Sequence, residues 1–228
     1  MKKKSKRYKL IQKKRVKDKL DPEKIFSLIK ETCTSKMDES IDVSLKINTK
    51  QTKGGDFNFR TVFKLPNGNG KKSKLAVLCE QEKVDEAKKA GADIAGADDL
   101  LEKISKGKFD FNKLLCTTGM MSKIGKYGKI LGPKGLMPNP KLGTVSSDLK
   151  KSISYIKNGL VEIKNDKDGN LALSIGRKSF SNEKLLENYK YFIDFLKKEK
   201  PDTLKGEFIK NIFLTSTMGI SFKVGARK

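Results

Sequence analysis

Histidine is absent from this sequence of 228 residues, and cysteine is scarce. The three cysteines, Cys33, Cys79 and Cys116, stand apart in apolar surroundings, without any Cys-x-x-Cys spacing. Structural zinc sites are built from cysteine and histidine, so we expect no metal site and interpret the cysteines as buried structural thiols. The usual general base of nucleophilic enzymes is also missing. We therefore expect no catalytic residue and no cofactor.

Long apolar runs are absent as well. No stretch approaches the roughly 20 apolar residues needed to cross a bilayer. The N-terminus is basic, and the apolar segment typical of a secretory signal does not follow it. From these absences we expect a soluble intracellular protein without a membrane partner.

Acidic residues are absent from one long segment, residues 111–147, although the whole chain has 27 of them. The segment contains six lysines, six glycines and three of the six prolines. Glycine lets a ligand approach the main chain and proline fixes φ, so we expect a shaped loop around residues 132–141. Such a loop, with exposed amides, lysines and no competing negative charge, suits a polyanion. We call residues 111–147 the acid-free segment.

The chain as a whole is strongly basic, with 51 basic residues, a net charge of +24 and an isoelectric point near 9.8. Residues 1–19 alone hold eleven basic residues and one acid, which predicts a basic arm with a helical part. This imbalance predicts a phosphate-rich partner. Codon bias is an alternative explanation for the lysine excess, but it does not explain why acids avoid particular segments.

Hydrophobic periodicity predicts two kinds of folding unit. Period-two alternation and amphipathic patterns predict strands at 41–47, 57–65, 161–163, 171–175 and 208–217, and helices at 22–33 and 183–198, with a hairpin-like turn at 165–169. The middle of the chain instead alternates short apolar strands at 75–79, 93–95 and 114–116 with helices at 82–90, 98–106 and 120–131 and one capped by Ser146 or Ser147. That alternation is typical of a small parallel sheet with covering helices.

An inserted domain explains this order simply. We expect residues 1–66 and 159–228 to form one α+β unit, and residues 67–158 to form an α/β unit inserted into it. The glycine-rich breaker at 66–70 is a candidate hinge between them.

The glycine-rich motifs do not match those of nucleotide-binding enzymes. Gly125-x-x-Gly128 and Gly132-Pro-Lys-Gly135 lack the Gly-Lys-Ser/Thr ending of a P-loop. A phosphate-transforming enzyme is therefore the weaker hypothesis, and amides and lysines that grip a nucleic-acid backbone fit better. The segment Thr215–Gly219 ends a predicted strand with three hydroxyls and a glycine, which suits contact with RNA 2′-hydroxyls and phosphates.

Two segments together resemble the bacterial-type L-one family of large-subunit ribosomal proteins. They are Gly132-Pro-Lys-Gly-Leu-Met-Pro-Asn-Pro-Lys141, followed by Gly143-Thr-Val145, and Ser216-Thr-Met-Gly219. Further blocks at 39–43, 65–68, 90–93, 165–169 and 205–206 follow in the family's order, so the resemblance covers nearly the whole chain. It implies a discontinuous split β-α-β-like antiparallel-sheet domain, joined by a two-stranded hinge to an inserted Rossmann-like parallel α/β domain.

The resemblance also implies a function. Family members bind the mobile lateral stalk of large-subunit ribosomal RNA, beside the exit site from which deacylated tRNA leaves, and many repress translation of their own operon messenger RNA. The implied partners are thus stalk RNA, exit-site tRNA and the protein's own messenger, with a monomer outside the ribosome. The implied location is the cytoplasmic ribosome, with an organellar ribosome as the alternative.

Finally, the resemblance implies the RNA-binding residues. On the discontinuous domain these are Lys36, Met37, Glu39, Ser40, Asp166, Lys167, Gly169, Ser216, Thr217, Met218 and Gly219, and on the inserted domain Lys134, Asn139 and Lys141. Met37 stands where the family usually has phenylalanine, so it keeps an apolar contact without ring stacking. The stretch 49–59 also departs from the family pattern.

Overall fold

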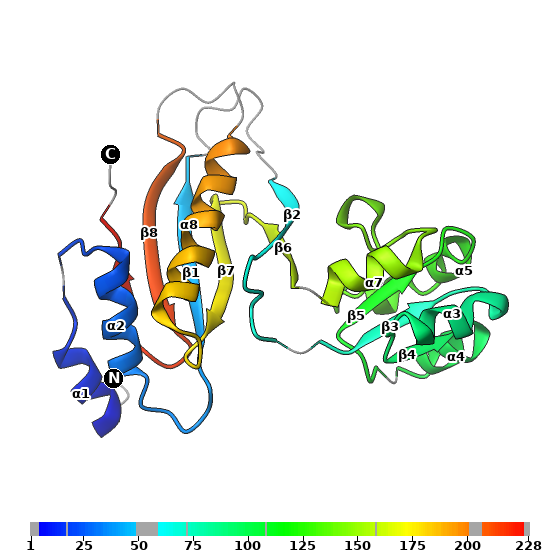
Figure 1. Ribbon diagram of the computed structural model, residues 1–228, viewed down its shortest axis with the longest axis horizontal. Coiled ribbons are helices and arrows are strands. Elements are labelled where there is room, and N and C mark those ends of the chain that lie inside the picture. Colours follow the sequence, from blue (N-terminus) through cyan, green and yellow to red (C-terminus); the bar gives the residue numbers. More distant parts are fainter. Residues whose placement is uncertain are drawn as a thin grey trace. The chain divides into compact units, whose positions relative to one another are not determined.

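The structure is a computed structural model (Figure 1) that describes residues 5–16, 18–48, 59–71, 73–107, 109–157, 159–200 and 207–225. The divergent stretch 49–58 and the family block at 205–206 lie outside the described residues. The chain divides into two compact units, residues 1–70 with 161–228, and residues 71–160. No helix among the described residues is long and apolar enough to cross a membrane.

The first unit is built on a four-stranded antiparallel sheet in the order β7-β1-β8-β9. Its strands are β1 (Ser40–Ile47), β7 (Asn170–Arg177), β8 (Ile209–Ser216) and β9 (Phe222–Lys223). Val43 of β1 lies opposite Leu173 of β7 and Leu214 of β8, and all three side chains are buried. The strands predicted from alternation at 41–47, 171–175 and 208–217 are confirmed.

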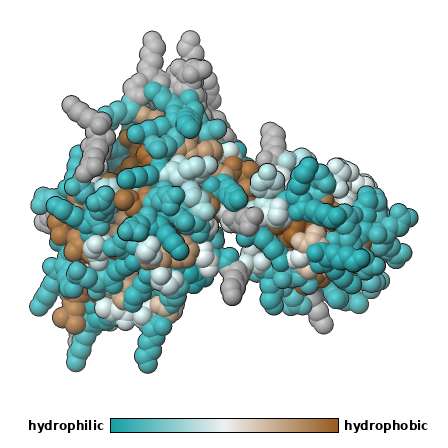
Figure 2. All heavy atoms as spheres, in the orientation of Figure 1, coloured by the Kyte–Doolittle hydropathy of each residue, from teal (hydrophilic) through white to brown (hydrophobic). Residues whose placement is uncertain are grey.

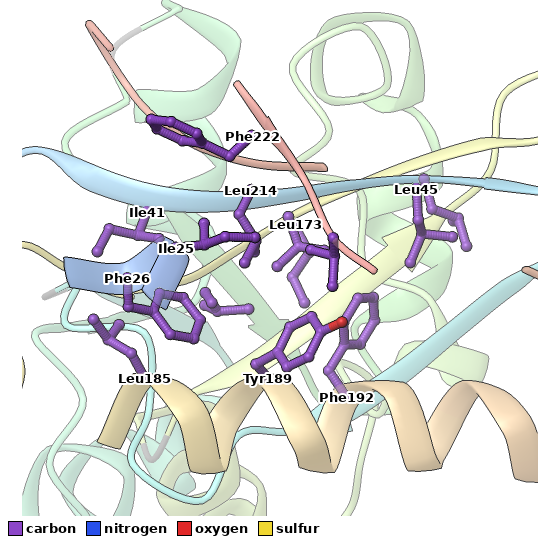
Figure 3. Close-up of a cluster of buried hydrophobic side chains, with 14 of the residues drawn as sticks. Ile25, Phe26, Ile41, Leu45, Leu173, Leu185, Tyr189, Phe192, Leu214 and Phe222 are labelled. Atoms are coloured by element: carbon purple, nitrogen blue, oxygen red, sulfur yellow. The ribbon is translucent and has the colours of Figure 1, made fainter. Parts of the chain in front are cut away.

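Helices α1 (Lys6–Lys13), α2 (Pro22–Thr32) and α8 (Asn182–Lys198) complete the first unit. Pro22 opens α2 as predicted, but the Asp21 side chain at the N-cap position makes no capping hydrogen bond. Figure 3 shows Tyr189 and Phe192 pointing from α8 into the core, beside Phe26 of α2 and the sheet residue Leu173. Burial in this core raises the pKa of Tyr189 to about 12.

A separate two-stranded sheet is formed by β2 (Arg60–Lys64) and β6 (Leu160–Lys164). The predicted turn at 165–169 therefore joins two different sheets, because β6 pairs with β2 while β7 pairs with β1. Period-two alternation reports which face of a strand is buried, and it does not report the strand's partner.

The breaker at 66–70, predicted as a candidate hinge, is anchored to α8. Asn188 is fully buried; its Oδ1 accepts the Asn67 amide at 3.1 Å, and its Nδ2 donates to the Gly68 carbonyl at 3.0 Å. Phe63 of β2 also stacks on Phe195 of α8, with ring centroids 5.1 Å apart. The start of the connection is therefore held by the first unit.

The second unit contains a three-stranded parallel sheet in the order β4-β3-β5. Its elements are β3 (Leu75–Leu78), η1 (Gln81–Lys83), α3 (Val84–Lys89), β4 (Ile94–Gly96), α4 (Asp98–Ser105), β5 (Lys113–Cys116), α5 (Met121–Gly125), α6 (Gly128–Leu131), η2 (Pro140–Leu142) and α7 (Leu149–Lys157). Leu78 and Cys116 pack in a cluster with α4 and α6, whereas Val77 and Leu115 pack in another with α7. Both faces of the sheet are thus covered, and the Rossmann-like α/β class is confirmed. All three cysteines are buried, as predicted.

Two helix predictions in this unit differ from the structure. The helix predicted at 120–131 is split into α5 and α6, where Gly125 ends the first and Gly128 begins the second. The helix predicted to be capped by Ser146 or Ser147 starts slightly later. The Asp148 carbonyl accepts the Ser152 amide at 3.3 Å, and the Ser146 hydroxyl accepts the Asp148 amide at 3.1 Å.

Candidate nucleic-acid interface

Eight of the predicted RNA-binding residues gather at one end of the antiparallel sheet. They come from the loop before β1 and from the end of β8, which lie side by side in the sheet. The Ser40 amide donates to the Thr217 hydroxyl at 3.0 Å, and the Thr217 amide donates to the Ser40 carbonyl at 3.1 Å. We call this set the end cluster: Lys36, Met37, Glu39, Ser40, Ser216, Thr217, Met218 and Gly219.

Glu39 lies at the buried centre of the end cluster, with 0% of the residue exposed. Its Oε1 accepts the Ser35 amide and its Oε2 accepts the Met218 amide, each at 3.2 Å. Burial alone would raise the pKa of this carboxyl, but the neighbouring Ser216 hydroxyl and the hydrogen bonds from the Met218 and Ser35 amides hold it below its ordinary value. The carboxylate therefore ties two distant loops together.

The solvent-facing part of the end cluster is made by other members. Lys36 and Thr217 are exposed, and the two methionines Met37 and Met218 are 55% and 49% exposed. A Cβ atom at Gly219 would lie 2.3 Å from the Ser216 Oγ, so this position has no room for a side chain. Gly219 is half-buried, so part of it faces solvent, and without a Cβ its backbone can be approached closely by a ligand.

The structure adds residues that sequence reasoning did not identify. Arg7 of α1 donates from Nη2 to the Met218 carbonyl at 2.6 Å, across a separation of 211 residues. Asp38 accepts the Ser179 amide at 3.1 Å, and Arg177 donates to the Asp38 carbonyl at 3.3 Å. The basic arm was visible as a run of charge, but nothing in the sequence indicates that one of its arginines contacts Met218.

Three predicted residues lie at the opposite end of β1, in the turn 165–169 between β6 and β7. The Ile47 amide at the end of β1 donates to the Gly169 carbonyl at 2.8 Å. At roughly 3.3 Å per residue, the eight residues of β1 separate this turn from the end cluster by about 23 Å. The structure therefore does not bring Asp166, Lys167 and Gly169 together with the end cluster.

Asp166 shapes this turn. Its Oδ1 accepts the Asn170 amide at 2.6 Å and its Oδ2 accepts the Asn170 Nδ2 at 2.8 Å. These bonds hold the pKa of Asp166 below its ordinary value, and the bond from the Asn170 side chain has a larger effect than the bond from its backbone. Gly169 has φ of +77°, a left-handed conformation that favours glycine, whereas Lys167 is exposed.

A polar sheet face connects the two ends. Directly opposed residues lie on the same face of a sheet. From the end cluster to the turn, that face carries the rows Thr215–Asp42–Ser174, Phe213–Ser44–Ala172 and Asn211–Lys46–Asn170. All nine residues are exposed or half-buried, whereas the opposite face carries the core. A depression of about 490 Å³ opens at the turn end, lined in part by Ser44, Asp166 and Ala172. We call these nine residues the polar face.

The three predicted residues of the second unit lie in the acid-free segment. Lys134 is exposed, and its Nζ lies 3.7 Å above the ring centroid of Phe109, a cation–π contact. The Asn139 amide donates to the Thr144 hydroxyl at 2.8 Å, and that hydroxyl donates to the Asn139 carbonyl at 3.1 Å. Lys141 belongs to η2.

Two glycines shape the turns of this segment. Gly135 and Gly143 have φ of +67° and +66°, so both turns favour glycine. The segment is thus an ordered loop, held by its own backbone.

Figure 2 shows that the visible face of each unit is mainly hydrophilic. Within the described part of the chain, no group of cysteines and acidic residues is arranged to hold a metal ion.

Comparison with known proteins gives consistent matches. A model of the ribosomal protein L1p/L10e family matches residues 29–220, a range that includes every predicted RNA-binding residue. A protein of Pelagibacter ubique, named large ribosomal subunit protein uL1, is 56% identical over 203 residues, which cover 89% of this chain and 88% of the relative. A protein with the same name from Thermosipho africanus is 45% identical over 98% of this chain and 97% of the relative. One from Thermobifida fusca is also 45% identical, over 87% of this chain and 84% of the relative.

Proposed function

Because this chain belongs to the ribosomal protein L1p/L10e family, we propose that it is a structural constituent of the large ribosomal subunit and binds the mobile lateral stalk of large-subunit RNA. The observation that carries this proposal is the polar face of the first unit. It runs between the end cluster and the turn 165–169, and both contain the residues that the family resemblance implies. An ordered polar surface of about 23 Å suits a folded RNA better than a small molecule.

The chemistry of the exposed groups supports contact with RNA. Lys36, Lys46 and Lys167 would contact phosphates, while the exposed Thr217 and the backbone at Gly219 would approach 2′-hydroxyls. The two carboxylates of the predicted site have another role. Both oxygens of Glu39 and of Asp166 accept hydrogen bonds within the protein, so these residues position the loops.

The acid-free segment supports a second contact from the inserted unit. Lys134, Asn139 and Lys141 would meet the backbone of the same stalk, and no acidic side chain within residues 111–147 would repel it. This contact rests on charge and on an ordered loop, so it would contribute affinity with little sequence preference. We propose no catalytic role for this loop, because it lacks a P-loop motif.

The same surface supports two further roles. A protein that reads the fold of an RNA also binds another RNA with that fold, so a stalk-like element in the chain's own operon messenger would compete for the polar face. We therefore propose that the chain also represses translation of that messenger. On the ribosome, the bound stalk would assist the release of deacylated tRNA from the exit site. Outside the cytoplasmic ribosome the chain would be a monomer.

The test compares two glycines of the first unit. Gly219→Val should weaken binding to a transcript of the ribosomal stalk by about ten- to a hundredfold, since the new side chain displaces the Ser216 hydroxyl and blocks close approach. Gly225→Ala is the control, because a Cβ there meets its nearest atom at 3.6 Å. Affinities would be measured by filter binding with the stalk transcript and with a scrambled transcript of equal length.

Two outcomes decide the proposal. Binding of the stalk transcript should fall steeply as salt rises from about 50 to 200 mM, because lysines displace counterions. Binding of the scrambled transcript should change little between wild type and Gly219→Val. Equal affinity of the wild-type chain for both transcripts would overturn the proposed function, and equal losses on both in the variant would move the site elsewhere.

A further inference from the structure

Only two methionines of the described chain are strongly exposed, and both belong to the end cluster. Met37 is 55% and Met218 is 49% exposed, whereas Met120 in the second unit is 5% exposed and Met121 and Met137 are half-buried. Exposed thioethers are the methionine side chains that peroxides reach first. Because both exposed methionines lie in the candidate interface, their oxidation would act where RNA is expected to bind.

The backbone at both methionines is held by hydrogen bonds, so both side chains start from defined positions in the end cluster. The Met37 amide donates to the Ser35 hydroxyl at 3.2 Å. The Met218 amide donates to Glu39, and its carbonyl accepts from Arg7. Because the Glu39 carboxylate also holds the Ser35 amide, one buried side chain sets the position of both loops.

The cysteines are much less accessible to the same oxidant. All three are buried, and burial raises the pKa of each thiol, to about 11 for Cys116. Oxidation of cysteine proceeds through the thiolate, which is therefore scarce at neutral pH. Among the described residues, the exposed sulfur of this chain is thus concentrated at the candidate interface.

We propose that Met37 and Met218 form a reversible oxidation site that controls the affinity of the end cluster for RNA. This inference rests on the proposed function. A thioether lone pair attacks one oxygen of hydrogen peroxide, the O–O bond breaks, and water leaves after proton transfer. The sulfur gains one oxygen and is oxidised by two electrons, while the peroxide is reduced. A methionine sulfoxide reductase, using a dithiol as reductant, reverses the change.

The physical effect follows from polarity. A thioether is a flexible apolar group that makes favourable contacts with aromatic rings. The sulfoxide carries a strong dipole that must lose its water when a base or sugar covers it. Oxidation of both side chains should therefore weaken binding to the stalk transcript by about tenfold.

The experiment uses the full chain and hydrogen peroxide. Peptide mass mapping should find the added oxygen first on Met37 and Met218, and last on Met120. Filter binding should then show about tenfold weaker affinity for the stalk transcript, restored by reductases for both sulfoxide epimers. The double variant Met37→Leu/Met218→Leu should no longer respond to peroxide. Its matched control, Met121→Leu/Met137→Leu, should respond as the wild type does.

The outcomes separate this inference from the function on which it rests. Untreated wild type that does not prefer the stalk transcript overturns the proposed function. Untreated wild type that binds, together with oxidised wild type that binds equally well, overturns only the oxidation site. The same holds if Met37→Leu/Met218→Leu loses as much affinity on peroxide treatment as the wild type. If that variant binds the stalk transcript poorly before treatment, the oxidised wild type provides the test. Affinity restored by the reductases supports the oxidation site, and affinity that stays low overturns it.

Discussion

The end cluster and the acid-free segment carry the two groups of predicted RNA contacts, and they are built in different ways. The end cluster joins residues 36–40 to residues 216–219, and the Ser40 amide meets the Thr217 hydroxyl across a separation of 177 residues. The acid-free segment is contiguous, and its loop is held by local bonds such as those between Asn139 and Thr144. One site depends on the fold of the first unit, while the other depends mostly on its own sequence.

This difference predicts different sensitivities. The end cluster has a buried charged residue at its centre, so a single change there should disturb both loops. The acid-free segment distributes its charge over several exposed lysines, so single changes there should have small and additive effects. The preference for the stalk transcript should therefore depend on the end cluster, whereas the end cluster and the acid-free segment should both contribute to the salt-dependent affinity.

The largest effect is expected for Glu39→Ala. The variant leaves the part-buried Ser35 and Met218 amides without their acceptor. Bonds to a charged group contribute about 1.5 to 3 kcal/mol each, so we expect a loss of about 2 to 4 kcal/mol in the free energy of unfolding. Affinity for the stalk transcript should fall about a hundredfold. Urea denaturation and filter binding measure the two quantities.

Glu31→Ala is the control for this variant. Glu31 is exposed and lies 3.7 Å from Lys14 in a surface ion pair, so its removal should change the stability by less than about 1 kcal/mol. If Glu39→Ala kept wild-type affinity for the stalk transcript, the end cluster would not depend on its buried carboxylate, and the contrast between the two sites would disappear.

A smaller effect is expected in the acid-free segment. Lys126 and Lys129 are exposed and make no ion pair with any residue that the structure describes, so the double variant Lys126→Ala/Lys129→Ala should weaken binding about tenfold at low salt. The loss should be similar for stalk and scrambled transcripts, and the slope of log affinity against log salt should fall by about one to two.

Lys123→Ala is the matched control in the same segment. Lys123 already pairs with Asp98 at 3.0 Å, so less of its charge is available to a ligand and its loss should matter less. A double variant that discriminated strongly between stalk and scrambled transcripts would show that the acid-free segment reads sequence or shape, contrary to the comparison drawn above.

The smallest effect is expected when the pH is lowered, and it concerns the free energy of unfolding. The folded-state pKa of Glu39 lies below its ordinary value of 4.5, so ionised Glu39 contributes stability that is fully present above that value and is lost as the pH falls through the folded-state pKa. Stability should thus decline below about pH 4.5. In Glu39→Gln this part of the pH dependence should disappear, as measured by urea unfolding at several pH values. Parallel pH profiles for wild type and Glu39→Gln would contradict this assignment.

Much of the fold could be predicted because local periodicity reports burial. The alternation at 41–47 became β1, the apolar stripe at 22–33 became α2, and the strand–helix alternation became the parallel sheet of the second unit. The predicted hairpin at 165–169 was wrong in one respect. Its two strands have distant partners, and alternation carries no information about pairing.

The candidate site could be predicted only in part. Composition located the acid-free segment directly and indicated the hydroxyl-rich segment Thr215–Gly219, whereas the remaining residues of the end cluster were named through family resemblance. Neither route indicated that the Glu39 carboxylate faces inward, that Arg7 reaches the Met218 carbonyl, or that residues 166–169 lie at the far end of β1. These facts depend on contacts between segments distant in sequence, and local sequence patterns carry no information about such contacts.

The sequence by itself determined the charge of this protein, its alternation of elements and the glycine turns of its basic loop, because each follows from residues that are neighbours in the chain. Tertiary structure alone decided which polar groups distant in the sequence form hydrogen bonds in the end cluster. The antiparallel register brings Ser40 beside Thr217, and burial turns Glu39 from a surface charge into a tie between two loops. A carboxylate acquires that role only when folding removes it from water and supplies amides in its place.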